Sequence, residues 1–411
     1  MAASAEVVVV GAGLAGLAAA RHLHRAGVAV RVCEAAERVG GRVATDEVDG
    51  FLLDRGFQVL LPAYPEVRRE VDLTALAPGY FSRGLLAGAQ RRWLGPPRSR
   101  PAGAGGGARE VLARPRDCAA LSLLSARDLA LPADRLGRVA RGTGAELRRW
   151  GISSRTVEDV LRPLLAGVFL DPALSTSAHL FHLVWRSFLA GGAVLPARGM
   201  RALPEQLAAA LPSGVVRTGE RVDGLGDTGD GVAVRLAGGA ELTARAVVVA
   251  TDADVAARLL PGLRTPSWHA VTTFYYRVAG SPAGAPVLLV DGGGLLLNSA
   301  VLSDVSPGYA PLGAALVAAS APGRADLGIE PRVRTRLAEL HRTGTADWEL
   351  IGAYPIDRAL PVFGPGEPLR RPVRLGSGRY VCGDHRDTPS IQGALVSGRR
   401  VARAVLADLG R

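Results

Sequence analysis

The stretch Val7-Val-Val-Val10-Gly11-Ala-Gly13-Leu-Ala-Gly16 decides the fold of this 411-residue chain. Four consecutive valines that end at a glycine predict a strand buried on both faces, as in a parallel sheet. The Ala- and Leu-rich segment 14–26 stops at Gly27, which predicts a helix. Another apolar run, 28–33, predicts a second strand. Residues 6–34 are therefore expected to form a strand–helix–strand unit.

The glycines of this stretch follow the pattern G-x-G-x-x-G. They allow a tight turn and a close approach of the backbone to a pyrophosphate, and the helix start offers its N–H groups and dipole to the phosphates. Glu34 closes the second strand, 18 positions after Gly16 (34 − 16), where a carboxylate suits both ribose hydroxyls and argues against a 2′-phosphate. We therefore predict an adenine dinucleotide site whose first loop is Gly11, Ala12, Gly13, Leu14, Ala15 and Gly16.

The residues after Glu34 indicate which dinucleotide is bound. The segment Glu34-Ala-Ala-Glu-Arg-Val-Gly40-Gly41-Arg42 resembles the second signature of the glutathione-reductase-type FAD flavoproteins. Within them it is similar to the superfamily of amine oxidases, phytoene desaturases and protoporphyrinogen oxidases. The resemblance implies that FAD contacts Glu34 and Ala35, that Gly40 and Gly41 pass close to its pyrophosphate, and that Arg42 supports it.

Further segments resemble the same superfamily. Asp54-Arg-Gly56-Phe57-Gln58 is similar to its D-x-G segment beside the flavin ring, and 247–253 is similar to its strand V-V-x-A-T. The segment 389–395 is similar to the start of a helix whose dipole stabilises the anionic reduced flavin. The resemblance implies further cofactor contacts at Gly56, Phe57, Gln58, Val222, Gly383, Asp384, Ile391, Gln392, Gly393 and Ala394.

The rest of the chain predicts two interleaved domains. Helical spacing covers 121–150, 157–169, 175–190, 201–211, 331–342 and 391–409, and 92–107 reads as an exposed loop or hairpin connection. Strands are expected at 215–216, 221–225, 231–236, 246–250, 274–278, 287–290, 295–301, 314–319 and 380–383. We predict an α/β fold: a Rossmann-like FAD-binding domain of the glutathione-reductase type (1–80, 196–255 and 350–411), interleaved with an α+β substrate domain (81–195 and 256–349) that has a mixed or antiparallel sheet and a helical section.

The amino-acid composition limits the classes of partner that the protein is expected to bind. The net charge is +11, but all 49 basic residues are arginines scattered among acids, which indicates codon bias and not a nucleic-acid partner. Mean hydropathy is +0.18, and we find neither a signal peptide nor an apolar run long enough to span a membrane. Three widely spaced cysteines fit a reducing cytoplasm. The arginine-rich surface permits peripheral contact with the inner face of the membrane.

The reaction follows from the resemblance. Members of the superfamily that the chain resembles oxidise C–H bonds beside nitrogen or desaturate C–C bonds, and they pass a hydride equivalent to flavin N5. No second G-x-G-x-x-G lies at a strand–helix junction, so we expect oxygen or a quinone as electron acceptor and no separate NAD(P)H site. Amine oxidases often use a lysine that holds a water at N5, and this chain has no lysine.

This absence favours a desaturase or dehydrogenase of a small-molecule, lipophilic substrate, isoprenoid- or porphyrinogen-like. Two alternatives stay open. One is a flavin amine oxidase with an aromatic cage, and the other is a flavin-binding redox sensor without turnover. The residues available for such a cage are Tyr275, Tyr276, Trp348 and Tyr354, each of which also suits a core position.

Catalytic groups are weakly marked, because hydride transfer depends more on alignment than on acid–base help. Gln58 is the candidate at the flavin edge. His385, Arg386 and Asp387 lie near the ring or form a surface ion-pair cluster. Remaining candidates are core residues: His179 and His182 have no third ligand, so no metal is expected, and nothing marks Cys382 as a covalent flavin attachment.

Overall fold

The protein is described from a computed structural model that covers residues 5–105, 115–132, 135–136, 140–229 and 231–411. Within these residues, a six-stranded sheet (the first sheet) has the order β19-β20-β13-β1-β2-β9. Its strands run parallel except for β19. They are β1 (Val7–Val10), β2 (Val30–Cys33), β9 (Val216–Arg217), β13 (Ala246–Val249), β19 (Arg374–Gly376) and β20 (Arg379–Val381).

Both faces of the first sheet are covered, as the four-valine run predicts. Val7 and Val9 face α1 (Leu14–Arg25), α9 (Ala202–Ala209) and α13 (Ile391–Asp408). Val8 and Val10 face a three-stranded antiparallel sheet and α10 (Ala253–Leu259). That small sheet consists of β10 (Val222–Thr228), β11 (Gly231–Leu236) and β12 (Glu241–Ala244). The layers confirm the predicted Rossmann-like architecture.

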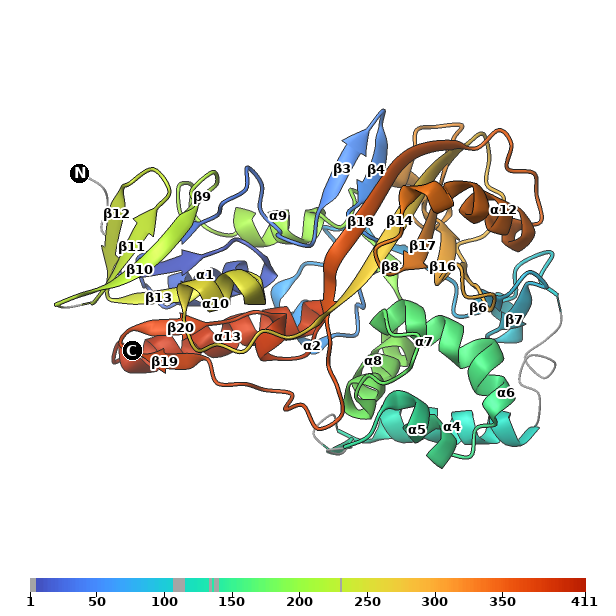
Figure 1. Cartoon of the computed structure of the whole chain (residues 1–411), viewed down its shortest axis with the longest axis horizontal. Helices are drawn as coiled ribbons and strands as arrows, with labels where there is room; N and C mark the ends of the chain where they lie inside the picture. Colours follow the sequence, from blue (N-terminus) through green and yellow to red (C-terminus); the bar gives the residue numbers. More distant parts are fainter. Residues whose placement is uncertain (1–4, 106–114, 133–134, 137–139, 230) are drawn as a thin grey trace.

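A second sheet lies at the other end of the molecule (Figure 1). In the described residues it has seven strands in the order β18-β14-β17-β16-β15-β6-β7. Only the β15–β6 pairing among these is parallel, so the sheet is mixed, as predicted. Its strands are β6 (Leu85–Ala87), β7 (Arg92–Leu94), β14 (Trp268–Val278), β15 (Leu288–Val290), β16 (Asn298–Val301), β17 (Ala315–Pro322) and β18 (Glu349–Pro361).

The faces of the second sheet bury different cores. Phe274 and Tyr276 pack with α12 (Glu330–His341) on one face, whereas Tyr275 packs toward the hairpin of β3 (Thr45–Val48) and β4 (Phe51–Asp54) on the other. The hairpin therefore joins the two ends of the molecule. Shorter elements are α2 (Pro65–Glu70), β5 (Gly79–Tyr80), η1 (Pro97–Ser99), β8 (Val194–Leu195), α11 (Leu302–Val305), η4 (Pro307–Tyr309), η5 (Leu327–Ile329) and η6 (Asp384–Arg386).

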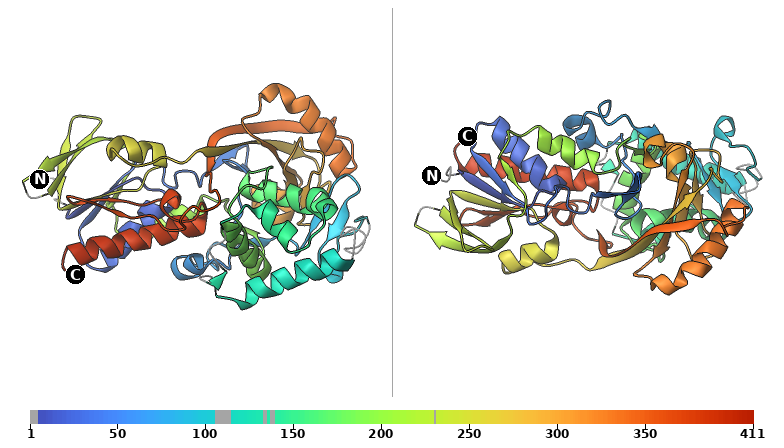
Figure 2. Two further views of the ribbon diagram at one scale, coloured as in Figure 1. Left: turned by 60° about the horizontal axis from the view of Figure 1, so that its bottom comes forward. Right: turned by 90° about the horizontal axis from the view of Figure 1, so that it is seen from above.

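The helical section lies beside the second sheet, as two further views show (Figure 2). The helix predicted over 121–150 is not continuous in the described residues: one helix ends at Ala130, just before Pro132, and another begins at Thr143, just after Gly142. The segment predicted over 157–169 begins with a π-helical turn, 157–161. The helices are α4 (Pro115–Ala130), α5 (Thr143–Arg149), α6 (Ser154–Thr156), α7 (Arg162–Phe169) and α8 (Ala178–Gly191).

Two expectations need correction. β18 pairs with β14, so it lies in the second sheet, whereas the predicted boundary at 350 would assign it to the FAD-binding domain. We therefore propose that the second domain extends to Pro361. The segment 92–107 is not simply exposed, since Arg92–Leu94 form β7 and the Trp93 side chain is buried between strands and α12. Residues 106–107 lie outside the described part.

Candidate cofactor and substrate site

The glycine-rich loop joins β1 to α1. A Cβ on Gly16 would lie 2.0 Å from the Gly11 carbonyl oxygen, so only glycine fits there. At Gly13 a Cβ would meet no protein atom within 4 Å, which means that this side of the loop faces open space. Gly13 is also the N-cap of α1 and supplies no side-chain cap, so the first N–H groups of the helix remain available to an anion. The loop therefore has the shape of a phosphate cradle.

Glu34 contacts this loop directly. Its Oε2 accepts a hydrogen bond from the Ala12 N–H at 2.6 Å, and its Oε1 accepts one from the Ala36 N–H at 2.9 Å. A carboxylate has about four acceptor positions. The partly exposed carboxylate of Glu34 therefore retains capacity for two ribose hydroxyls.

Gly40 and Gly41 lie against the first loop. The Gly40 N–H donates to the Ala12 carbonyl at 2.9 Å, and Gly13 and Gly40 form an isolated parallel bridge. Gly40 has φ +111°, and a Cβ there would lie 2.3 Å from the Val43 carbonyl oxygen. The structure thus brings together the two glycine motifs that the sequence predicts to flank a pyrophosphate.

Arg42 follows at once and is held from three directions. Its Nη2 donates to Asp384 Oδ1 at 2.5 Å, and its Nη1 donates to the Ala359 carbonyl at 3.2 Å. Its guanidinium carbon lies 5.4 Å from the centre of the Trp268 ring. The Arg42 side chain remains 38% exposed. An arginine has five N–H donors, so the donors that these contacts do not use remain available to a ligand. Sequence reasoning missed Trp268, because a lone aromatic residue outside any motif gives no signal.

The D-x-G segment connects the two domains. Asp54 is buried, and its carboxylate accepts hydrogen bonds from Thr45 Oγ1, the Met200 N–H and the Tyr309 hydroxyl. Burial raises the pKa of Asp54 to about 6 despite these donors. The following residues, Gly56, Phe57 and Gln58, lie between β4 and the second sheet. The sequence singled out this segment through its resemblance to the D-x-G segment, and the anchoring contacts of Asp54 come from the structure.

Gln58 and Phe57 have structural partners here. The Gln58 amide nitrogen donates to the carbonyls of Arg42 (2.9 Å) and Arg55 (3.1 Å), so it ties the D-x-G segment to the Gly40–Arg42 segment. The Phe57 N–H donates to Thr273 Oγ1 at 3.2 Å. Gln58 therefore holds the loop, and its catalytic role stays a prediction.

The segment after β20 is buried. His385, Arg386 and Asp387 expose between 5% and 8% of their surface, so they do not lie at the surface, although Asp387 does form an ion pair, with Arg400 at 3.2 Å. Burial lowers the pKa of His385 to about 4, which keeps it neutral at pH 7. Neither ring nitrogen of His385 has a hydrogen-bond partner in the described part of the chain. Gly383, with φ +148°, leaves room for this ring, because a Cβ there would lie 2.4 Å from His385 Cε1.

The start of α13 completes the first domain's side of the site. Ser390 caps the helix and accepts from the Gly393 N–H at 3.0 Å. Ile391 and Ala394 are partly exposed, whereas Gln392 Oε1 accepts from the Glu66 N–H at 2.9 Å and so is committed to α2. Val222 starts β10 just beyond Glu220, whose N–H donates to the Glu34 carbonyl. This adjacency places the Val222 segment beside the predicted adenine-ribose end.

The four aromatic residues considered for an amine cage do not form one. Tyr275 and Tyr276 lie on opposite faces of β14, and both are fully buried. Tyr275 packs edge-on against Tyr354, whereas Tyr276 packs with Trp348 in the core under α12. These side chains therefore serve as core residues, as the plainer interpretation had it.

The remaining candidates are structural too. His182 is fully buried and lies between Asp128 (Nδ1 to Oδ2, 2.7 Å) and Glu146 (Nε2 to Oε1, 3.5 Å). Among the described residues no group of three His, Cys, Asp or Glu side chains is placed to hold a metal. Cys382 is buried, and burial raises the pKa of its thiol. No helix in the described residues has the length and apolarity to cross a membrane.

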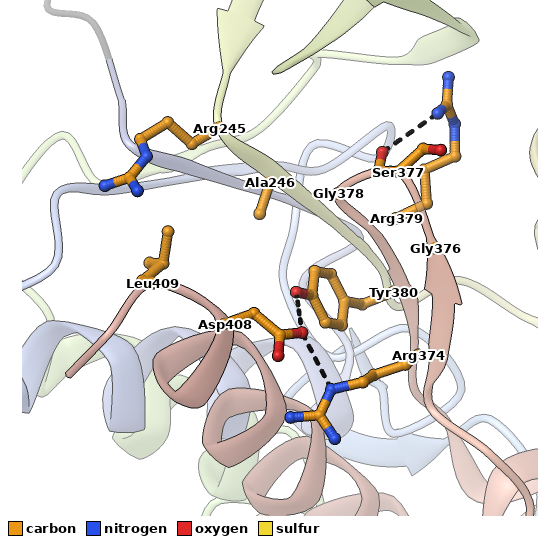
Figure 3. A pocket seen from close by; sticks show the side chains of 10 residues that line it. All are labelled: Arg245, Ala246, Arg374, Gly376, Ser377, Gly378, Arg379, Tyr380, Asp408 and Leu409. Carbon is orange, nitrogen blue, oxygen red and sulfur yellow. Dashed lines mark hydrogen bonds and ion pairs between the residues drawn. The ribbon is translucent and has the colours of Figure 1, made fainter. Parts of the chain in front are cut away.

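A hollow of about 450 Å³ lies elsewhere (Figure 3). It is lined by residues at which β13 and β20 begin, whereas the two glycine motifs follow the ends of β1 and β2. Its arginines already have acidic partners: Arg374 with Asp408, Arg245 with Glu6 and Arg379 with Asp227. In an open parallel sheet, ligands bind at the carboxyl ends of the strands. This hollow is therefore not the cofactor site.

Comparison with known proteins defines the class. The family model described as "Flavin containing amine oxidoreductase" matches residues 14–406. A redesigned putrescine oxidase shares the fold over 98% of this chain and 99% of its own, with a TM-score of 0.73 and 20% identity. The protein is an FAD-dependent oxidoreductase. It belongs to the flavin-containing amine oxidoreductase family, and FAD is its cofactor.

Individual relatives cover the chain to different extents. Hydroxysqualene dehydroxylase from Rhodopseudomonas palustris is 29% identical and aligned over 98% of this chain and 99% of its own. Phytoene dehydrogenase from Streptomyces griseus is 34% identical over 64% of this chain and 56% of its own. Putrescine oxidase from Kocuria rosea is 52% identical over only 67 residues, so the match spans 14% of that relative.

Proposed function

We propose that this protein is an FAD-dependent dehydrogenase or desaturase of a large apolar substrate of the isoprenoid type. The observation that carries the proposal is an apolar cluster beside the D-x-G segment, in which Leu170, Ile356 and Ala359 keep part of their surface exposed. Ile356 Cδ1 would lie 3.0 Å from a Cβ on Gly56, and Ile356 belongs to a cluster formed by α7, β14 and β18. That cluster consists of Ala166, Leu170, Val271, Leu297, Ile356 and Ala359.

Such a surface suits a hydrocarbon, because apolar contact removes hydrocarbon from water without leaving a polar group unpaired. Ala359 belongs to the apolar cluster, and its carbonyl accepts from Arg42. The substrate surface and the proposed cofactor contacts are therefore adjacent. Two relatives named for hydrocarbon-like substrates, hydroxysqualene dehydroxylase and phytoene dehydrogenase, support the same class.

The residues of this chain then have distinct tasks. Bound FAD supplies the hydride acceptor for a substrate C–H bond. The glycine loops, Glu34 and Arg42 bind and orient the cofactor, and the apolar cluster excludes water and aligns the substrate. Desaturation removes a hydride and a proton, so in our proposal the hydride passes to the flavin and the proton from the neighbouring carbon passes to solvent, while Gln58 holds the loop.

An amine oxidase is the second candidate, and the short match to putrescine oxidase favours it. The sequence has no lysine to hold a water at the flavin, and the aromatic candidates are committed to two separate cores. Both features favour the apolar substrate. The electron acceptor in our proposal is oxygen or a quinone, and the arginine-rich surface would allow the protein to meet apolar substrates at a membrane.

The test is anaerobic mixing of the FAD-loaded protein with substrates of both classes, followed through the loss of flavin absorbance. We expect squalene-type and polyene precursors, supplied in detergent or vesicles, to bleach the flavin, and putrescine and benzylamine to leave it oxidised. Bleaching by the amines alone would contradict the proposal. A flavin that none of these compounds reduces would instead favour the redox sensor.

A further inference from the structure

Arg42 is held mainly by the second sheet, although it belongs to the first domain's motif. The Ala359 carbonyl that accepts from Nη1 comes from β18, and Trp268 opens β14. In register, Trp268 lies opposite Pro361 of β18. Only the contact to Asp384, among the three described, comes from the FAD-binding side. The guanidinium is thus held between β14, β18 and Asp384, and part of the side chain stays exposed.

Trp268 touches Arg42 with its ring and not with its polar edge. The indole Nε1 is buried and finds no hydrogen-bond partner among the described residues. The guanidinium carbon lies over the ring at 5.4 Å from its centre. A cation within about 6 Å of an indole face is attracted by the ring's quadrupole, and a planar guanidinium stacks on it.

We propose that Trp268 is a positioning residue for the cofactor: its ring fixes the Arg42 guanidinium beside Gly40 and Gly41 and thereby raises the affinity for FAD. The inference rests on the proposed placement of FAD along these glycines. An arginine that is stacked in advance loses less rotamer freedom when it binds an anion. Because two of its N–H groups are used by Asp384 and Ala359, the rest of its five donors are left for cofactor oxygens.

A double-mutant cycle tests the inference without any substrate. The four proteins are the wild type, Trp268→Leu, Arg42→Gln and the double variant. Apoprotein is titrated with FAD, and the dissociation constant is read from flavin fluorescence. We expect Trp268→Leu to raise the dissociation constant about 2- to 30-fold, the range for a cation–π contact from exposed to desolvated. In the Arg42→Gln background the same change should have no further effect.

Two variants separate positioning from folding. Trp268→Phe keeps an aromatic face and should give an intermediate dissociation constant, so it serves if Trp268→Leu fails to fold. Trp348→Leu removes a buried tryptophan that packs on Tyr276 and His341, so it should lower thermal stability with FAD affinity unchanged.

Wild-type affinity in Trp268→Leu, or an equal loss in both Arg42 backgrounds, would overturn the inference. A wild-type protein that takes up no FAD would instead contradict the cofactor placement itself. The substrate proposal is not involved in these measurements, so its failure would leave them unaffected.

Discussion

The Tyr309 hydroxyl donates a 2.7 Å hydrogen bond to the Asp54 carboxylate, which joins η4 to the end of β4. Tyr275 donates to the backbone carbonyl of the same aspartate at 2.6 Å. Both tyrosines are fully buried. The D-x-G segment is therefore anchored to the second domain through a carboxylate that is desolvated on all sides.

This anchor predicts a pH dependence. The pKa of Asp54 is about 6 in the fold, against an ordinary value of 3.8. Between these pH values the folded state binds more protons than the unfolded state, so the free energy of unfolding should fall as pH rises through this window. Full ionisation should cost about 3 kcal/mol. Asp54→Asn should lose this dependence, as measured by urea unfolding from pH 4 to pH 7.

The pH dependence of stability must be compared between the wild type and Asp54→Asn, because His341 and His385 change the free energy of unfolding with pH in the direction opposite to Asp54. Burial lowers the pKa of each to about 4, so the stability they confer is lost as pH falls below about 6.5. That part is the same in both proteins. Parallel curves for wild type and Asp54→Asn would show that Asp54 is ionised at no unusual cost.

The two glycines of the first loop should respond differently to alanine. A Cβ at Gly13 enters only open space, so Gly13→Ala should keep the apoprotein's melting temperature and weaken FAD binding. A Cβ at Gly16 would lie 2.0 Å from the Gly11 carbonyl oxygen, so Gly16→Ala should lower both the melting temperature of the apoprotein and its affinity for FAD. Flavin content and thermal melting of the apoproteins measure the difference. If Gly13→Ala binds FAD normally, the cofactor does not approach that side of the loop.

Glu34 should matter through both of its oxygens. Glu34→Ala leaves the Ala12 and Ala36 N–H groups without their acceptor and removes the proposed ribose contact, so we expect FAD affinity to fall at least about tenfold. The exposed neighbour Glu37 provides the matched control, Glu37→Ala, which should bind FAD like the wild type. Equal affinities for both variants would argue against a ribose-binding role.

His182 should be a stability residue and not a metal ligand. Replacing it by leucine removes the shared partner of Asp128 and Glu146 in a buried site, which should cost about 1–3 kcal/mol of unfolding free energy, because Arg127 and Arg141 still pair with the two carboxylates. The exposed His24→Ala on α1 is the control and should cost almost nothing. EDTA should leave the melting temperature of the wild type unchanged. A chelator-induced shift would reveal a metal site.

Local patterns in the sequence were enough to predict the first domain. A four-valine strand and glycines with fixed spacing act within a few residues, so the loop at 11–16 followed from local chemistry, whereas the role of Gly40 was implied by the family resemblance and its contact with Gly13 is seen in the structure. β18 escaped notice because its burial is mixed along its length and its partner, β14, is distant in sequence. The contact between Trp268 and Arg42 depends on that same long-range pairing. So does the separation of Tyr275 and Tyr276 into two different cores, which the sequence did not reveal.

The close packing of α13 on α1 also bears on how the chain is made. A Cβ on Gly398 would lie 2.4 Å from the Ala15 carbonyl, so the helices meet along their backbones. During synthesis α1 (Leu14–Arg25) is made long before α13 (Ile391–Asp408), because the two helices lie far apart in the sequence. Before α13 is made, the apolar face of α1 lacks the helix that covers it. Arg42 likewise lacks its partner Asp384, which lies shortly before α13 in the sequence. We therefore expect the complete cofactor site to form only after α13 has been synthesised and has packed on α1.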